Sequence, residues 1–416
     1  MIDSIFYIIL IIEIYLFARL DYLKWGTLVT PFNMLAILFG LVTSLAIAYS
    51  YSHPDVKNFY LPSLIVWIIG LAVFYIPSSL IHYKATPQQL TIGNTIPKKD
   101  HLYVVLYGIT LFFILLALIK IRSVGVNATV GTDEFSEGYD GAAGAFAHIS
   151  MFLSMMFAYF FYKIDRKHKL AAIPIVLILF ISFAQASKTH ILAPLLMGFF
   201  TRLLTGKTRL SLKIIIIISL SAASVFFGIY FISIILSGAT DSYDVYFNFV
   251  TLHFLDYFLG GTLSFSLDYQ YGILEPDMTT GLVSPFLSVW EKVTGITSTA
   301  QIDNPLFLNM GDLGETNVRT FFGTIFAYSK SYVVLIILTF FISTLVYTIY
   351  YFAIKKRNIF LIIATSANLT YLIFGSFFDF YWIHLYPYEI VVISYILFVV
   401  SSIEYGASYK KTQAAA

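Results

Sequence analysis

The sequence contains no cysteine, which excludes a disulfide framework, a thiolate nucleophile and a metal site with thiolate ligands. It is also poor in charge: only 12% of its 416 residues are Asp, Glu, Lys or Arg, about half of what an average soluble domain carries. No phosphate-binding loop, dinucleotide-binding glycine motif, HExxH zinc motif or EF-hand loop is present. We therefore expect no nucleotide hydrolysis, no cofactor, no metal and no nucleic-acid partner.

Long apolar runs are what the chain has instead, and 59% of its residues are hydrophobic. A helix of about 20 apolar residues crosses the hydrocarbon core of a bilayer. The sequence predicts an all-α polytopic membrane protein with about eleven transmembrane helices. We place them near residues 4–18, 31–51, 60–81, 102–120, 144–162, 170–187, 189–204, 213–236, 331–353, 358–377 and 383–403.

The basic residues are segregated among the loops. Most of the 25 Lys and Arg residues lie in alternate connections and in the C-terminal tail, and the positive-inside rule places these in the cytoplasm. The expected orientation has the N-terminus outside and the C-terminus in the cytoplasm. The basic residues on the outer side are then Lys57, Lys120, Arg122, Lys188, Lys292, Arg319 and Lys330.

One outer connection, residues 237–330, is far too long for a turn and rich in aromatic residues. We expect it to fold as a cap between an N-terminal transmembrane bundle, residues 1–236, and the C-terminal helices and tail, residues 331–416. Within it, Leu282 to Val293 has an amphipathic pattern that predicts a helix in the outer membrane interface.

Three cations of the outer side are candidates for binding an anionic phosphate. Lys188 lies between two apolar segments in a polar turn, where a charge is costly unless it has a function, although an interfacial lysine that extends to water also fits. Arg319 lies where the long loop returns to the membrane, and a guanidinium group binds phosphate with two parallel hydrogen bonds. Arg122 ends a helix on the same side, where a simple flanking charge is the alternative.

A histidine of the long loop is the candidate general base. His253 is followed three residues later by Asp256, so a helix would place both on one face. A packing role for a single histidine is the alternative. The expected sugar-binding residues are Tyr257, Asn317, Tyr381 and Trp382, for the last two of which an aromatic belt at the membrane interface fits equally.

Three local patterns resemble a known family. They are Thr316-Asn317-Val318-Arg319-Thr320-Phe321, the small-residue stretch Tyr257 to Phe265 around Gly260-Gly261, and Ser187-Lys188-Thr189-His190 at the start of an outer-side helix. With the helix number and the late outer loop, they resemble the Wzy-type oligosaccharide repeat-unit polymerases of bacterial O-antigen and capsule synthesis. Position 319 is arginine where the family pattern has an aromatic residue.

The resemblance implies a GT-C-like, metal-independent glycosyltransferase in the bacterial cytoplasmic membrane. Its substrate would be an undecaprenyl-pyrophosphate-linked oligosaccharide, with membrane lipid, a flippase and a chain-length regulator as partners. For such a reaction we expect His253 to be the base, with Asp256 and Arg319 as further catalytic residues. We expect Lys188, Arg319 and Arg122 to bind the pyrophosphate and stabilise its developing negative charge. An O-antigen ligase, a flippase for lipid-linked oligosaccharide and a small-solute transporter stay open as alternatives.

Overall fold

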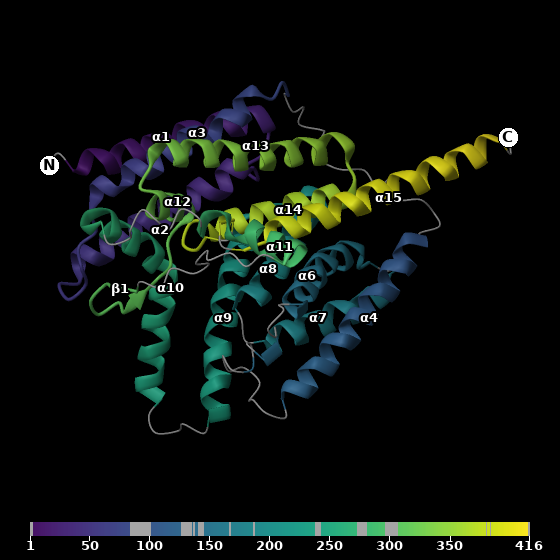
Figure 1. Ribbon diagram of the computed structural model, residues 1–416, viewed down its shortest axis with the longest axis horizontal. Helices are drawn as coiled ribbons and strands as arrows, with labels where there is room; N and C mark the ends of the chain where they lie inside the picture. The colour runs from purple at the N-terminus through teal and green to yellow at the C-terminus, as the bar shows by residue number, and fades with distance from the viewer. Residues whose placement is uncertain are drawn as a thin grey trace. The chain divides into compact units, whose positions relative to one another are not determined.

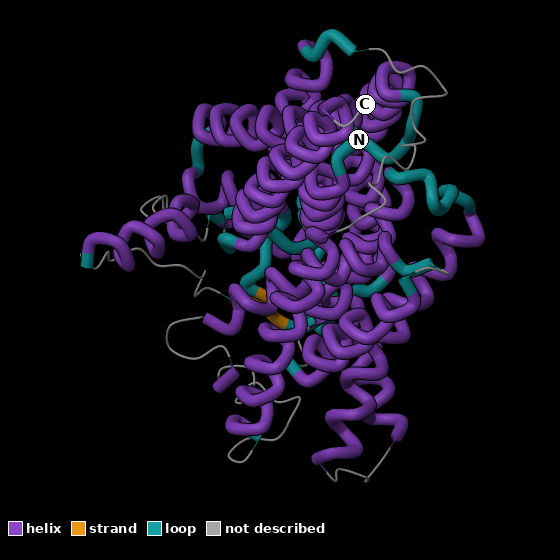
Figure 2. The backbone as a smooth tube through the Cα atoms, turned by 90° about the vertical axis from the view of Figure 1, so that its right-hand side faces the viewer, coloured by secondary structure: helices purple, strands orange, loops and turns teal. Residues whose placement is uncertain are grey.

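The computed structural model (Figure 1) describes part of the chain. The described residues are 3–83, 101–125, 135, 138–139, 145–165, 168–185, 188–237, 243–272, 281–295, 307–379, 381–382 and 384–414. Figure 2 shows that regular structure in these residues is helical except for two short strands.

The helices follow one another with short connections over much of the chain. In chain order they are α1 (Ser4–Trp25), α2 (Pro31–Ser52), η1 (Leu61–Ser63), α3 (Leu64–Leu80), α4 (His101–Val124), α6 (Ala145–Lys163), η2 (Lys169–Ala171), α7 (Ala172–Ala184), α8 (Lys188–Leu204), α9 (Leu212–Ser237), α10 (Tyr243–Tyr271), α11 (Ser284–Thr294), α12 (Phe321–Ser329), α13 (Tyr332–Lys356), α14 (Ile359–Phe374) and α15 (Tyr386–Ala414). The strands are β1 (Leu308–Asn309) and β2 (Glu315–Thr316).

Each of the eleven segments predicted to be helical contains a helix among the described residues, so the all-α class is confirmed. Among the described residues, six helices are long and apolar enough to cross a membrane, and four more are apolar but shorter. The six are Pro31–Ser52, Leu61–Leu80, His101–Val124, Ala145–Lys163, Tyr332–Lys356 and Tyr386–Ile403. The number of eleven membrane crossings therefore stays a prediction.

The chain forms two compact units. The first contains residues 1–87, 242–348 and 368–387, and the second contains residues 88–241, 349–367 and 388–416. The long loop between 237 and 330 thus belongs almost wholly to the first unit, together with the first three long helices. This grouping follows contacts in space, whereas the three predicted segments follow the order of the chain.

The described part of the long loop is mainly helical. Its first part is α10, a helix of 29 residues, and its middle contains α11, at the place where the amphipathic pattern predicts a helix. One face of α11 exposes Phe286, Val289 and Val293, which are spaced as successive turns of a helix require. The helical prediction for this segment is confirmed, and its place in the membrane interface stays a prediction.

The strands form a hairpin that holds the loop against the start of the chain. Leu308 pairs with Thr316 and Asn309 with Glu315 in antiparallel register. The turn also contacts the segment after α2, where the backbone N–H of Lys57 donates to the carbonyl of Met310 at 3.1 Å. Gly311 has a φ of 81°, and a Cβ atom there would lie 1.9 Å from the carbonyl oxygen of Asp55. Only glycine fits such an approach of two backbones.

Candidate functional site

Two of the three sequence patterns meet in the first unit, where the loop before α12 lies on α10. A Cβ atom on Gly261 would come within 2.0 Å of the carbonyl oxygen of Phe377, so glycine at this position lets the backbone after α14 contact the helix directly. One turn further along α10, the hydroxyl of Ser264 donates to the carbonyl of Val318 at 2.6 Å. The small-residue stretch therefore forms the surface that receives the Thr316–Phe321 segment.

The loop is fixed on the far side of Arg319 as well. Thr320 is the N-cap of α12, and its hydroxyl oxygen accepts from the N–H of Gly323 at 3.3 Å. The indole N–H of Trp67 donates to the same hydroxyl at 3.0 Å. The N–H of Phe321 donates to the carbonyl of Gly375 at 2.8 Å. Arg319 therefore sits between two anchored residues, in a backbone that has little freedom to move.

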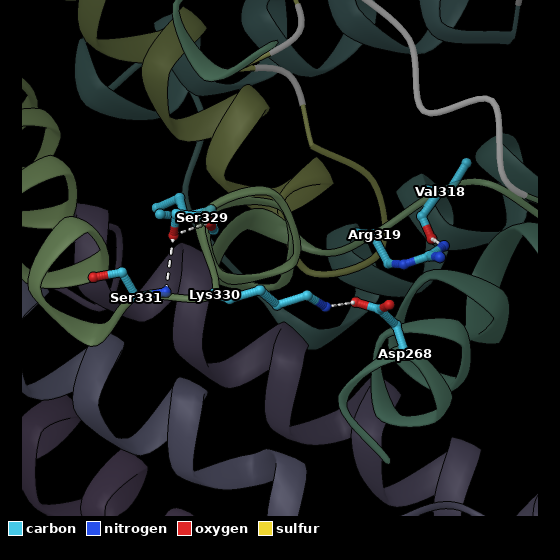
Figure 3. A network of polar contacts seen from close by, with 7 residues as sticks. Asp268, Val318, Arg319, Ser329, Lys330 and Ser331 are labelled. Carbon is cyan, nitrogen blue, oxygen red and sulfur yellow. Dashed lines mark hydrogen bonds and ion pairs between the residues drawn. The ribbon is translucent and has the colours of Figure 1, made fainter. Parts of the chain in front are cut away.

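Arg319 is the central side chain of the candidate site (Figure 3). It is 2% exposed, and its Nη1 donates to the carbonyl of Val318 at 2.8 Å. Its Nε and Nη2 are buried and have no hydrogen-bond partner among the described residues. Nε and Nη2 form one edge of the guanidinium plane, and this edge carries the two parallel N–H bonds that a phosphate or carboxylate accepts. The contact with Val318 occupies the other nitrogen and leaves that edge available.

Two further charged residues lie beside Arg319. Asp268 on α10 is fully buried, and its Oδ2 lies 3.1 Å from Nζ of Lys330 (Figure 3). Burial lowers the pKa of Arg319 to about 10, while the negative charge of Asp268 opposes that change. The guanidinium group is charged at neutral pH, because its pKa stays well above 7. With two cations and one carboxylate, the cluster carries a net positive charge and favours an additional anion.

Lys330 owes its position to an unusual backbone conformation. It has a φ of 48°, in the left-handed region that residues other than glycine seldom adopt, and it ends α12 as the C-cap. Its N–H donates to the carbonyl of Phe326 at 2.7 Å. A left-handed residue with a side chain costs about 1–2 kcal/mol. The ion pair with Asp268 is a gain that glycine at this position would not provide.

Asp268 interacts electrostatically with Arg319 but is not among the candidates that the sequence indicates. The acidic residues nearest to Arg319 in the sequence, Asp312 and Glu315, are both exposed, and Glu315 accepts from the side-chain amide of Asn309 at 2.9 Å. The signal for Asp268 was available, since it follows the buried polar residues Thr262, Ser264 and Ser266 in an otherwise aromatic and apolar stretch. A charge on a buried face calls for a partner of opposite charge.

The predicted base lies earlier on the same helix. His253 packs between the rings of Phe249, at 5.5 Å, and Tyr257, at 4.9 Å between ring centroids. It precedes Ser264 by eleven residues, which is about 16 Å along a helix. Asp256 lies close to Gly260, and its Oδ1 would be 2.7 Å from a Cβ atom on that glycine. Tyr257 is 47% exposed. The roles of these residues in catalysis and sugar binding stay predictions.

Tyr381 and Trp382, which are expected to bind sugar, lie inside the first unit. They are 1% and 3% exposed, and both rings contact Phe321. The hydroxyl of Tyr381 donates to Oδ1 of Asn368 at 2.8 Å. Both rings are covered by protein in this structure, and their role in sugar binding stays a prediction. Asn317 is partly exposed in the loop before Arg319 and stays a candidate.

The other predicted phosphate ligands belong to the second unit. Lys188 is the first residue of α8, and Arg122 is exposed in the last turn of α4. This unit also contains an ion pair between α6 and α15, in which Nδ1 of His148 lies 2.6 Å from Oε1 of Glu389. No cluster of three residues of the types that bind metals occurs among the described residues.

The structure defines a class: an all-α protein with several helices able to cross a membrane and a buried, cationic site in its first unit. The comparison with protein families identifies the family. The profile of DUF6337, a family of unknown function, matches residues 55–406, and the chain belongs to this family. No curated protein and no solved structure matches the chain.

Proposed function

We propose that the chain is a membrane glycosyltransferase that takes its sugar from a lipid-linked pyrophosphate. The observation that carries the proposal is the Nε–Nη2 edge of Arg319, which is buried, charged and without a hydrogen-bond partner among the described residues. An unsatisfied buried donor costs about 1–3 kcal/mol, and more when it is charged. A bound anion removes that cost.

Pyrophosphate suits this site as the leaving group of a transfer reaction. When the bond between the anomeric carbon and the phosphate oxygen breaks, negative charge develops on that oxygen. A donor edge that is already in position stabilises the charge without reorganisation during the reaction. The acceptor hydroxyl loses its proton to a base, for which His253 and Asp256 stay the candidates, and forms the new bond to the anomeric carbon. Cleavage of the bond between the sugar and the pyrophosphate supplies the free energy for the transfer, so no nucleotide is needed.

The finer proposal is a repeat-unit polymerase with a GT-C-like fold in the bacterial cytoplasmic membrane. It rests on the resemblance of the Thr316–Phe321 and Tyr257–Phe265 patterns, which the structure brings together through Ser264 and Val318. The substrate would be an undecaprenyl-pyrophosphate-linked oligosaccharide at the outer face. The acceptor distinguishes this reaction from that of a ligase: a polymerase lengthens the lipid-linked glycan, whereas a ligase transfers it to another acceptor.

The test uses Arg319→Ala and Arg319→Lys in the full-length protein. Both should reach the membrane at normal levels, because among the described residues the guanidinium group makes a single hydrogen bond, to Val318. We expect Arg319→Ala to lose polymer and to accumulate lipid-linked single repeat units. Arg319→Lys should recover little activity, since an ammonium group cannot bind phosphate through two parallel N–H bonds.

Arg19→Ala is the matched control, because Arg19 is an exposed arginine of the same unit. It should leave the polymer unchanged. Full-length polymer made by a stably expressed Arg319→Ala protein would remove Arg319 from the site and refute the proposal.

A further inference from the structure

Three tyrosines from different parts of the first unit come together next to the charged cluster. Tyr60 precedes η1, Tyr269 lies near the end of α10, and Tyr332 begins α13. The hydroxyls of Tyr269 and Tyr332 lie 2.9 Å apart and share a hydrogen bond. The ring centroids of Tyr60 and Tyr269 are 6.2 Å apart. All three side chains are partly exposed, in contrast to the buried Tyr381 and Trp382.

The rings of this tyrosine cluster pack against buried residues of the first unit. Phe326 of α12 lies 5.5 Å from the ring of Tyr269 and 4.8 Å from that of Tyr332, measured between centroids. The backbone N–H of Tyr60 donates to the hydroxyl of Ser266 on α10 at 3.4 Å. Packing of this kind fixes the orientation of the rings before a ligand arrives, so binding orders few side chains.

The hydroxyls retain capacity for further hydrogen bonds. A phenol has one donor and accepts as well. In the pair formed by Tyr269 and Tyr332, only one of the two O–H groups is the donor. The other donor and the remaining lone pairs can serve a polar ligand. A surface that combines aromatic faces with hydroxyl groups suits a sugar ring, which has an apolar face and hydroxyls at its edge.

The position of the cluster relates it to the phosphate site. Tyr269 follows Asp268 directly, and Tyr332 is two residues after Lys330. The Asp268–Lys330 ion pair and the Tyr269–Tyr332 hydrogen bond therefore join the same two segments side by side. The tyrosines therefore closely follow the ion pair along both segments.

From this juxtaposition we propose that Tyr60, Tyr269 and Tyr332 form a carbohydrate subsite that binds the sugar attached to the pyrophosphate. The inference rests on the proposed function and adds the residues that select a glycosylated carrier over a bare one. A membrane-interface role predicts something different. Tyr60 directly precedes one candidate membrane span and Tyr332 begins another, and interfacial tyrosines would affect stability without distinguishing the two carriers.

The experiment measures dissociation constants of the purified full-length protein in detergent for two probes, undecaprenyl pyrophosphate and undecaprenyl-pyrophosphoryl-N-acetylglucosamine. The wild type should bind the glycosylated probe more tightly. In the double variant Tyr269→Phe with Tyr332→Phe, the rings remain and the hydroxyls are lost. Loss of two hydrogen bonds should reduce the preference about tenfold, with no change for undecaprenyl pyrophosphate. Tyr269→Ala, which removes a ring, should reduce it further.

Tyr271→Phe is the matched control, because Tyr271 is 61% exposed on the same helix, two residues beyond Tyr269. It should keep the wild-type preference. Equal weakening of both probes in the variants, or a wild-type preference in both the double variant and Tyr269→Ala, would overturn the subsite. Failure of the proposed function has a separate readout, since the wild type would then not bind undecaprenyl pyrophosphate at all.

Discussion

Replacing Asp268 by asparagine should have opposite effects on stability and on anion binding. The carboxylate is fully buried and pairs with Lys330. The substitution keeps the size of the side chain and removes its charge. Two cations, Lys330 and Arg319, then remain in the cluster without the negative group that lies beside them. The folded protein should lose stability, while an anionic ligand should gain affinity because it no longer shares the cations with a carboxylate.

The size of the stability effect follows from the geometry of the ion pair. At an N–O distance of 3.1 Å, an effective dielectric constant of about 20 gives an attraction of roughly 5 kcal/mol. Part of this is offset by the cost of taking the two charges out of water, and breaking a buried pair typically costs about 3–5 kcal/mol. The side chain of Lys330 is 22% exposed, so water compensates it in part. We expect Asp268→Asn to lower the free energy of unfolding by about 3 kcal/mol.

The assay is thermal unfolding of the purified variants in detergent, with and without inorganic pyrophosphate. Asp268→Asn should unfold at a lower temperature than the wild type, and pyrophosphate should raise its unfolding temperature by more. Asp312→Asn is the control, since Asp312 is an exposed aspartate of the same unit. If Asp268→Asn is as stable as the control and pyrophosphate stabilises it no better, the carboxylate does not balance these cations and the electrostatic reasoning is wrong.

Two further predictions concern packing and topology. Gly261→Ala places a methyl group about 2 Å from the backbone of Phe377, so we expect the free energy of unfolding to fall by about 1–3 kcal/mol. The control is Gly108→Ala in α4, where a methyl group meets no atom within 4 Å; it should be neutral or slightly stabilising in the same unfolding assay. The chain has no cysteine of its own, so single introduced cysteines can be labelled without background. A cysteine at Ser242 should react with an impermeant thiol reagent in intact cells, and one at Ser211 only after lysis. The reverse pattern would invert the expected orientation.

The sequence was sufficient to predict the helices because their signal is local. Apolar runs of membrane length can hardly fold otherwise, since a bilayer offers no partner to an exposed backbone. The helix boundaries were less accurate where the apolar run ends before the helix does. The first predicted segment stops at residue 18, but α1 continues to Trp25. Its last turns contain Asp21, which accepts hydrogen bonds from Ser78 and Tyr347. Contacts that distant in sequence leave no local pattern.

The same difference between local and distant signals explains the prediction of the site. Arg319 could be recognised because it is the charged residue of a short sequence pattern. Its acidic neighbour could not be recognised, because Asp268 is 51 residues away in the sequence and is brought close by the packing of the loop on α10. The burial of Tyr381 and Trp382 could not be predicted for the same reason. Burial by Phe321 is a tertiary effect that their own neighbours do not encode.

The arrangement of α10 connects these observations. Its glycines allow the segments around Thr316 and Phe377 to lie directly on the helix, and Ser264 then binds the carbonyl of Val318. That carbonyl also accepts Nη1 of Arg319, so one oxygen fixes both the loop and the guanidinium plane. The next turn of α10 provides Asp268, and the residue after it, Tyr269, faces the proposed sugar subsite. One helix therefore supplies the surface for the loop, the orientation of the arginine, the balancing charge and an aromatic ring. A substitution such as Gly261→Ala should for this reason disturb anion binding as well as stability, although Gly261 itself contacts no ligand in the proposed site.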